Sequence, residues 1–246
     1  MSLTKNEIKL IKSLQTKRQR EENKLFVIEG EKMVNELFEQ SKFKIDCIYF
    51  TDDYESTLIP STVNALQIST KDLERITGFK TANKVLAVVN QLQNTTTEYT
   101  DNNLILILDD VNDPGNLGTI IRTADWFGIT QIIASPKTVE LYNPKVIQSS
   151  MGAVYRMNYI VNDLTLEISN LKKNNFEVAG AIIHGENIYN SKLPTKTALI
   201  MGSESHGISD ELLRLVDLEI SIPNFGKTES LNVAMATGIL LSEYKR

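Results

Sequence analysis

The stretch Asn112-Asp-Pro-Gly-Asn-Leu-Gly-Thr-Ile-Ile-Arg122 decides the fold, because it joins an apolar strand to an amphipathic helix. The strand, Leu104–Leu108, is apolar throughout. Continuous apolar strands are typical of a parallel sheet that is covered on both faces. Gly115 and Gly118 allow tight backbone turns, and we expect the helix to cover 118–127 with its free N–H groups facing a ligand.

Two later stretches have the same character. Met201-Gly-Ser-Glu-Ser-His-Gly207 and Ile222-Pro-Asn-Phe-Gly-Lys-Thr-Glu-Ser-Leu-Asn-Val233 each begin where an apolar run ends, and each is rich in small and polar residues. Ligands of wound α/β sheets bind outside the carboxyl ends of the strands. The three stretches therefore predict one composite pocket.

Periodicity predicts two α/β units joined by a linker. We expect an N-terminal domain over 1–92, a linker over 93–103 that has little to bury, and a second domain over 104–246. Expected strands of the first domain are 25–28, 45–50, 66–68 and 85–89, and expected helices are 31–40 and 70–76. Expected strands of the second are 104–108, 131–134, 176–183, 197–201 and 218–222, with helices at 118–127, 144–151, 164–174, 209–216 and 230–244.

The composition is that of an ordinary globular protein, with 246 residues of which 41% are hydrophobic and 23% charged. The apolar runs last about five residues, far short of the roughly twenty that a membrane-spanning helix needs. The N-terminus has no apolar signal core, and Cys47 is the single cysteine. These features favour a reducing, cytoplasmic location.

The formal net charge of −5 argues mildly against non-specific binding to nucleic acid. Residues 1–24, however, hold seven basic and three acidic side chains, a local charge of +4. This segment is either a solvated helix face or a surface that contacts phosphates. The candidate RNA contacts are Lys12, Lys17, Arg18 and Arg20.

Arg122 is the most informative single side chain. We expect it one turn into its helix, where a cation is poorly placed in the field of the helix dipole. Its planar fork would suit a phosphate or a carboxylate, although a surface arginine on an amphipathic helix is the simpler alternative. Ser230 is expected to cap the last helix, and Asn232, a poor helix former, to lie in its first turn.

Several common sites are excluded. Gly202–Gly207 has the glycine spacing of a Walker loop, but Ile208 stands where that loop requires lysine. The G-K-T ending of Gly226–Thr228 lacks its leading glycine, because Ser221 stands there. No cysteine or histidine spacing indicates zinc, and we expect no metal. Ser205 and His206 are neighbours in sequence without the strand–turn–helix setting of a hydrolase nucleophile.

Taken together and in this order, the three stretches resemble motifs 1, 2 and 3 of the SpoU/TrmH family of RNA ribose 2′-O-methyltransferases, within the SPOUT superfamily. The resemblance covers about 104–246. The N-terminal third resembles the substrate-binding domain of that family, of ribosomal-protein L30e-like type, most clearly in Phe26-Val-Ile-Glu-Gly-Glu-Lys32. Two departures are Ser205, where glycine is common, and Asn224-Phe225, where Met-Pro or similar is usual.

The resemblance implies a trefoil-knotted domain with a parallel sheet, a homodimer, the cofactor S-adenosyl-L-methionine and structured RNA as substrate. The appended N-terminal domain favours ribosomal over transfer RNA. The family's catalytic positions fall on Asn116, Arg122, Glu204, Ser230 and Asn232. Its cofactor-binding positions fall on Ala179, Gly180, Ala181, Met201, Gly202, Glu204, Ile222, Ser230 and Leu231.

In such an enzyme Arg122 is either a general base or a clamp that grips a substrate phosphate and stabilises the developing alkoxide. Asn116 and Asn232 would position the ribose, Ser230 would hold cofactor or target, and Glu204 would orient the pocket. Two rivals stay open. One is a non-catalytic RNA-binding or ribosome-assembly protein that kept the fold, and the other an unrelated α/β enzyme that binds a phosphorylated ligand at Gly115–Gly118.

Overall fold

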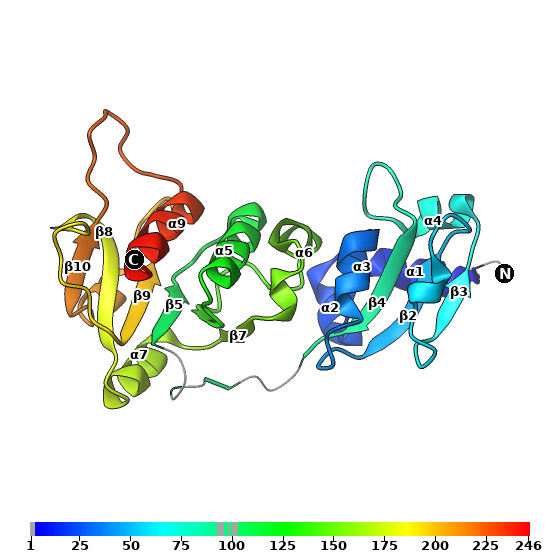
Figure 1. Cartoon of the computed structure of the whole chain (residues 1–246), viewed down its shortest axis with the longest axis horizontal. Coiled ribbons are helices and arrows are strands. Elements are labelled where there is room, and N and C mark those ends of the chain that lie inside the picture. Colours follow the sequence, from blue (N-terminus) through cyan, green and yellow to red (C-terminus); the bar gives the residue numbers. More distant parts are fainter. Residues whose placement is uncertain (1–2, 93–95, 98, 100–102) are drawn as a thin grey trace. The chain divides into compact units, whose positions relative to one another are not determined.

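A computed structural model describes residues 3–92, 96–97, 99 and 103–246. The chain forms two compact units, Met1–Asn94 with Tyr142–Tyr155, and Thr95–Leu141 with Arg156–Arg246 (Figure 1). Most of the expected linker, 93–103, lies outside the described residues. Within the described part of the chain, no helix combines the length and the apolar character needed to cross a membrane.

The N-terminal unit is built on a mixed four-stranded sheet in the order β1-β4-β2-β3. The central strand β4 pairs antiparallel with both β1 and β2, and β2 pairs parallel with the edge strand β3. The strands are β1 (Leu25–Glu29), β2 (Ile45–Phe50), β3 (Ala65–Gln67) and β4 (Val85–Asn90). They match the expected strands to within a residue, because each apolar run coincides with a buried strand.

Helices of the N-terminal unit include two that the sequence reading did not place. The first, α1, begins with a capping box in which Thr4 and Glu7 bond each other's backbone N–H groups. The helical elements are α1 (Lys5–Ser13), α2 (Lys17–Asn23), α3 (Glu31–Leu37), α4 (Thr70–Ile76), α6 (Pro144–Ser150) and the short 3₁₀ turns η1 (Ser56–Leu58) and η2 (Ala153–Tyr155).

Residues 142–155 pack with the N-terminal unit, although the sequence reading placed them in the second domain. The Tyr142 ring lies 4.5 Å from the Phe26 ring, measured between centroids. Its hydroxyl accepts a 2.9 Å hydrogen bond from the backbone of Leu92, and the Tyr155 hydroxyl donates to the carbonyl of Met33 at 3.2 Å. Such contacts between distant segments leave no signature in local periodicity.

Arg20 corrects one of the expected RNA contacts. Its side chain is only 2% exposed, and Nη1 donates a 2.6 Å hydrogen bond to the carbonyl of Leu14, at the end of α1. Arg20 therefore ties α2 to α1 and is not available to RNA. Lys12, Lys17 and Arg18 are exposed, and the last two form ion pairs with glutamates one turn further along α2.

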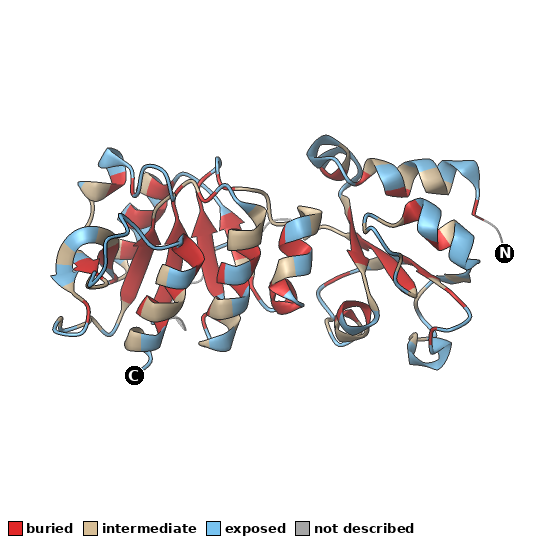
Figure 2. Cartoon of the chain, turned by 90° about the horizontal axis from the view of Figure 1, so that it is seen from above, coloured by how far each residue is buried: buried red, intermediate tan, exposed pale blue. Residues whose placement is uncertain are grey.

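The C-terminal unit contains a six-stranded sheet in the order β10-β8-β9-β5-β6-β7, and every pairing in it is parallel. Its strands are buried beneath helices (Figure 2), so the expected α/β class with a parallel sheet is confirmed. The strands are β5 (Leu104–Leu108), β6 (Gln131–Ala134), β7 (Asn158–Val161), β8 (Glu177–Asn187), β9 (Thr197–Met201) and β10 (Leu218–Ser221). The helices are α5 (Pro114–Trp126), α7 (Leu164–Lys173), α8 (Asp210–Leu213) and α9 (Val233–Tyr244).

Glu167 fastens the described part of the expected linker to this unit. Its carboxylate is 6% exposed and accepts hydrogen bonds from the hydroxyls of Thr97 and Tyr99, at 2.9 and 3.3 Å. The amide of Asn162 donates a third bond at 2.6 Å. A buried carboxylate needs such donors, so Thr97 and Tyr99 are held rather than solvated.

Candidate active site

Helix α5 begins one turn earlier than the sequence predicts. Asp113 is the N-cap and its side chain accepts a 2.9 Å hydrogen bond from the backbone N–H of Asn116. Pro114 fills the first helical position, as is common at helix starts. Gly115 and Gly118 therefore lie inside the helix, not in a loop before it. With a carboxylate already at its N-terminus, this helix is poorly suited to the phosphorylated ligand of the second rival hypothesis.

Three side chains from the three quoted stretches meet at one place. Asn116 and Asn232 both donate from Nδ2 to Oε1 of Glu204, the second bond being 2.8 Å long. Asn232 also donates to Oδ1 of Asn116 at 3.0 Å. We call this the Asn116–Glu204–Asn232 cluster. Its existence confirms that the carboxyl ends of β5, β9 and β10 lead into a common site.

Asn232 is the N-cap of α9, which begins at Val233 and not at Ser230 as expected. Its Oδ1 accepts hydrogen bonds from the backbone of Ala234 and Met235, at 3.0 and 3.3 Å. Asparagine is among the best N-cap residues, because its side chain satisfies the free N–H groups of the first turn. Ser230 is exposed and lies outside the helix. One side chain therefore both starts α9 and completes the cluster.

This double role gives a testable result. We expect Asn232→Ala to lower the free energy of unfolding by about 1–2 kcal/mol, because the cap of α9 is lost. Asn116→Ala is the matched control, since it removes a cluster contact and leaves the cap in place. Urea unfolding of both variants measures the difference. Equal losses of stability would show that the cap contributes nothing.

The loop after β9 is closed on itself. Ser203 and Gly207 exchange two backbone hydrogen bonds of 2.9 Å, and Ser203 Oγ accepts a 3.2 Å bond from the backbone of His206. Gly207 has a positive φ of +68°, which closes the turn. Gly202 lies so close to the returning chain that a Cβ there would be 2.2 Å from the Gly207 carbonyl carbon. This tight loop holds Glu204 toward Asn116 and Asn232.

A cavity of about 130 Å³ adjoins the cluster. Three carboxylates line it, those of Asp110, Asp113 and Glu204. The sequence reading did not assign Asp110 a role. Asp110 has a φ of +58°, and its backbone N–H and carboxylate both bond the hydroxyl of Ser135, at 3.0 and 2.7 Å. A non-glycine residue in this conformation is uncommon, and at a strand end it marks a site that the surrounding structure holds in place.

Asp109, its neighbour, links two of the quoted stretches. It is 6% exposed, and its Oδ2 accepts a 2.8 Å hydrogen bond from the backbone of Ser209. Its backbone N–H donates to the carbonyl of Met201 at 2.9 Å. The two aspartates after β5 were visible in the sequence, and their position at a buried strand end is the signal that could have identified them.

Arg122 does not join the cluster within one chain. It lies on the exposed surface of α5, six residues after Asn116, which is about 9 Å along the helix axis. Its guanidinium makes no hydrogen bond or ion pair with any residue that the structure describes. Because the helix starts at Pro114, Arg122 is more than two turns from the N-terminus, so the expected conflict with the dipole does not arise.

The positions expected to bind a cofactor lie at the carboxyl ends of β8, β9 and β10. Ala179 and Gly180 pair with Leu199 and Ile200 of β9, and Met201 ends that strand. On the other side the register shifts, so that Gly180 faces Glu219 and Glu186 faces Ile220. The chain from Ala181 to Gly185 therefore bulges out of the sheet beside the end of β9.

The third quoted stretch forms a long loop after β10, the dark orange segment of Figure 1. Asn224 braces it, accepting from the backbone of Gly226 and donating to the carbonyl of Thr228, both at 2.8 Å. The side chains of Phe225 and Leu231 are 95% and 49% exposed. Asn224 therefore organises this part of the loop where the family pattern has methionine.

These three strand ends fit S-adenosyl-L-methionine in character. Ala179, Gly180, Ala181 and Gly202 carry little or no side chain, so their backbone groups are open to a polar heterocycle. Ile222 and Leu231 add apolar surface for its flat faces. No cluster of three or more potential metal-ligating side chains occurs among the described residues.

Comparisons with known proteins agree with this geometry. The pattern described as "SpoU rRNA Methylase family" matches residues 103–242, and that described as "MRM3-like substrate binding domain" matches residues 5–87. The chain is 28% identical over 241 residues to the 23S rRNA (guanosine(2553)-2′-O)-methyltransferase RlmP of Bacillus subtilis, covering 98% of this chain and 96% of that protein.

Two further relatives support the same assignment. An AdoMet-bound rRNA methyltransferase from Sinorhizobium meliloti superposes with a TM-score of 0.89 at 27% identity, over 100% of this chain and 96% of that one. The 23S rRNA (guanosine-2′-O-)-methyltransferase RlmB of Neisseria meningitidis is 37% identical over 145 residues, 58% of each chain.

Proposed function

Because the chain belongs to the SpoU rRNA methylase family, we propose that it transfers a methyl group from S-adenosyl-L-methionine to a ribose 2′-hydroxyl of ribosomal RNA. The observation that carries this proposal is the Asn116–Glu204–Asn232 cluster, in which three stretches far apart in the chain form one site. A non-catalytic RNA-binding protein would have no need for this arrangement beside the ends of β8, β9 and β10.

The cofactor-binding residues we propose are those at the three strand ends. Ala179, Gly180, Ala181, Met201, Gly202, Ile222 and Leu231 bind mainly through backbone groups and apolar contact, and Ser230 and Glu204 add polar side chains. The bound cofactor supplies an electrophilic methyl group on a sulfonium, so the protein needs chiefly to position the attacking oxygen. Asn116 and Asn232 orient the ribose, and Glu204 holds both amides in place.

Arg122 is proposed to act across the subunit interface of a homodimer. It is exposed and has no partner among the described residues, as expected of a group whose partner is a substrate phosphate. Its fork grips that phosphate beside the target ribose and stabilises the developing alkoxide of the partner's site. An arginine that loses its proton at neutral pH is scarce, so the electrostatic role is the stronger of the two.

The dimer is supported by two exposed apolar side chains on neighbouring helices. Trp126 of α5 is 85% exposed and Met235 of α9 is 63% exposed, and α5 packs against α9. Exposed tryptophan is unusual unless a partner covers it. Trp126 lies one turn beyond Arg122, so an interface here would carry Arg122 toward the second subunit.

Trp126→Glu tests this interface. We expect a monomer by analytical ultracentrifugation and a loss of methyl transfer, because a buried unpaired charge opposes association. Leu166→Glu is the control, since Leu166 is also exposed, at 61%, but lies on α7. A dimeric Trp126→Glu protein would show that the subunits meet elsewhere.

We further propose that the C-terminal unit is knotted. Its last segment leaves β10 at one edge of the sheet and returns to α5, which follows β5. On the way, Asn232 bonds both Asn116 and Glu204, so this segment runs between the loops after β5 and β9. That course supports a threaded chain, although knots are rare in proteins.

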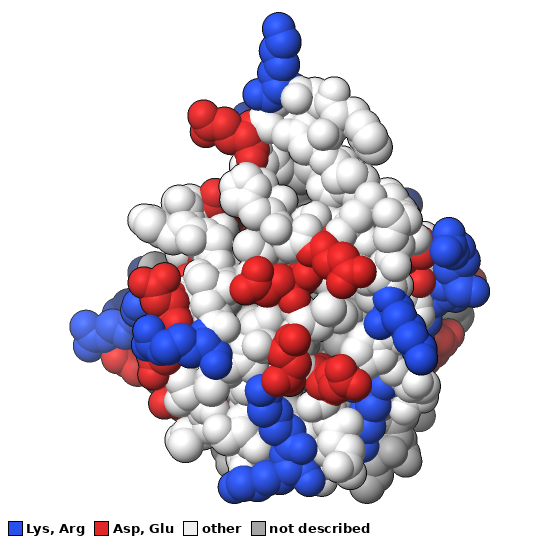
Figure 3. Space-filling view, turned by 90° about the vertical axis from the view of Figure 1, so that its left-hand side faces the viewer, with Lys and Arg blue, Asp and Glu red and all other residues white. Residues whose placement is uncertain are grey.

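Ribosomal RNA is the proposed partner, and the cytoplasm, where ribosomes are methylated, is the proposed location. The Bacillus subtilis and Neisseria meningitidis relatives are both named for 23S rRNA. Lys12, Lys17 and Arg18 are the proposed phosphate contacts of the N-terminal unit. On the face of the C-terminal unit beside β10, carboxylates hold the middle and cations the border (Figure 3), so phosphates would be repelled from its centre.

Titration with S-adenosylhomocysteine tests the reaction. We expect calorimetric heat with about one site per subunit, followed by the appearance of one 2′-O-methyl nucleotide when the protein acts on unmodified ribosomal RNA. RNA binding without any response to S-adenosylhomocysteine would instead support the non-catalytic RNA-binding protein.

A further inference from the structure

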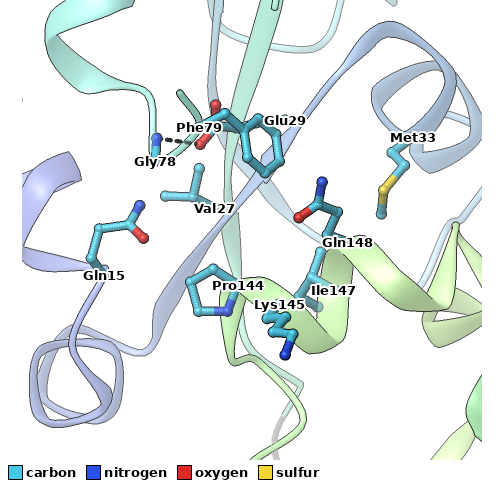
Figure 4. Close-up of a pocket in the computed structure, with 10 residues that line it drawn as sticks. All are labelled: Gln15, Val27, Glu29, Met33, Gly78, Phe79, Pro144, Lys145, Ile147 and Gln148. Atoms are coloured by element: carbon cyan, nitrogen blue, oxygen red, sulfur yellow. Dashed lines mark hydrogen bonds between the residues drawn. The ribbon is translucent and has the colours of Figure 1, made fainter. Parts of the chain in front are cut away.

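A second cavity lies within the N-terminal unit. It has a volume of about 170 Å³, and Figure 4 shows the side chains that surround it. Its floor is apolar, since Val27, Met33 and Ile147 are 7%, 6% and 2% exposed. Its border is polar and includes Gln15, Glu29 and Gln148. An apolar floor with a few polar groups at the edge suits a small flat heterocycle.

Glu29 is the charged group of this cavity. One carboxylate oxygen accepts a hydrogen bond from the hydroxyl of Thr77, and the other accepts one from the backbone of Gly78 at 2.8 Å. An ionised carboxylate has about four acceptor positions, so about two are still available. Burial raises the pKa of Glu29, and the bonds from Thr77 and Gly78 lower it in part. A desolvated carboxylate gains strongly from further N–H donors.

Two amide side chains face the cavity without a partner. Neither Gln15 nor Gln148 makes a side-chain hydrogen bond with the residues that the structure describes. Each amide can donate and accept, so both can bond the edge of a heterocycle. Lys145 adds a positive charge to the same border.

Phe79 supplies an aromatic face. Its ring lies beside the Glu29 carboxylate in Figure 4. Its backbone N–H donates a 3.1 Å hydrogen bond to the same Thr77 hydroxyl that bonds Glu29, so the ring and the carboxylate are held together. Unstacked RNA bases are commonly recognised by stacking on an aromatic ring and by hydrogen bonds to the base edge.

We propose that this cavity binds an unpaired guanine of the RNA substrate, with Glu29 accepting hydrogen bonds from guanine N1–H and the N2 amino group. Among the four bases, only guanine presents two adjacent N–H donors on its pairing edge, which matches the two oxygens of a carboxylate. Gln148 or Lys145 donates to guanine O6. The RNA substrate rests on the proposed function, and the cavity itself does not.

Binding of short RNAs to the full chain tests this proposal. The probes are the hexanucleotides UUGUUU, UUAUUU and UUIUUU, where inosine lacks the N2 amino group, measured by fluorescence anisotropy. We expect UUGUUU to bind about tenfold more tightly than UUAUUU, with UUIUUU in between. Equal affinities for all three would overturn the proposal.

Variants locate the selectivity. Glu29→Gln is expected to remove the guanine preference, and Glu74→Gln, which changes an exposed carboxylate of α4, to keep it. Because Glu29 also holds Thr77 and Gly78, the melting temperature of each variant is measured as well. Gln148→Ala removes no internal hydrogen bond and is expected to weaken guanine binding without loss of stability. A Glu29→Gln protein that melts earlier but keeps the preference would show that the carboxylate only fastens the loop.

The two proposals can fail separately. S-adenosylhomocysteine titration does not involve the N-terminal cavity, so its failure would remove the methyltransferase and leave guanine selectivity to be observed or not. Methyl transfer by a protein with no guanine preference would remove only the cavity proposal. If both hold, Glu29→Gln is expected to raise KM for RNA several-fold with kcat and S-adenosylhomocysteine affinity unchanged.

Discussion

Replacing Arg122 by alanine is expected to lower the rate of methyl transfer about 100- to 1,000-fold, the loss typical when one group that stabilises developing negative charge is removed. The side chain has no internal partner, so folding and S-adenosylhomocysteine binding should be unchanged. Arg122→Lys is expected to recover little, because a lysine cannot reproduce the planar fork. Single-turnover rates on ribosomal RNA measure the effect, and near-normal turnover of Arg122→Lys would contradict the assignment.

Mixing experiments decide which subunit uses Arg122. If Arg122 serves the partner's site, dimers that combine an Arg122→Ala subunit with an Asn232→Ala subunit contain one intact site. Random exchange of two inactive variants then restores about a quarter of the wild-type activity, because half of the dimers are mixed. If Arg122 served its own chain, every site in the mixture would lack one residue, and no activity would return.

Replacing Gly202 by alanine is expected to have the largest effect on structure. The new Cβ would lie 2.2 Å from the carbonyl carbon of Gly207 and 2.3 Å from the backbone nitrogen of Ile208. Both atoms belong to the backbone, so the loop that holds Glu204 must open. We expect a loss of about 3 kcal/mol in the free energy of unfolding and no measurable S-adenosylhomocysteine binding, by urea denaturation and calorimetry.

Gly128→Ala is the matched control for this clash. Gly128 has a φ of +68° and open space around its Cα, so alanine there costs about 1–2 kcal/mol of backbone strain and meets no neighbour. It lies just beyond α5 and should bind S-adenosylhomocysteine normally. If Gly202→Ala behaved like Gly128→Ala, the tightness of the loop would have no bearing on the site.

Much of the fold could be predicted from the sequence, because each buried strand is an uninterrupted apolar run. Leu104–Leu108 and Thr197–Met201 were expected at their observed limits. The edge strand β7 (Asn158–Val161) was not expected, since its four residues include only two that are buried. The affiliation of residues 142–155 with the N-terminal unit depends on contacts such as Tyr155 with Met33, which no local pattern reveals.

Prediction of the site succeeded where strand ends determine it and failed where helix starts do. Asn116, Glu204 and Asn232 meet because β5 and β9 are adjacent and parallel and α9 returns between their loops. The starts of α5 and α9 were wrong by a turn, because Asp113 and Asn232 cap more effectively than the residues assigned. Arg20 was misassigned because charge alone does not distinguish a solvated arginine from a buried one.

The bonds from Asn232 to Asn116 and Glu204 also set the order in which the protein matures. The residue that completes the cluster lies at the start of the last helix, and its partner lies near the middle of the chain. During synthesis, a growing polypeptide therefore exposes its strands long before α9 has left the ribosome. Catalytic competence is acquired only at the end of translation, so truncated products can bind RNA without modifying it.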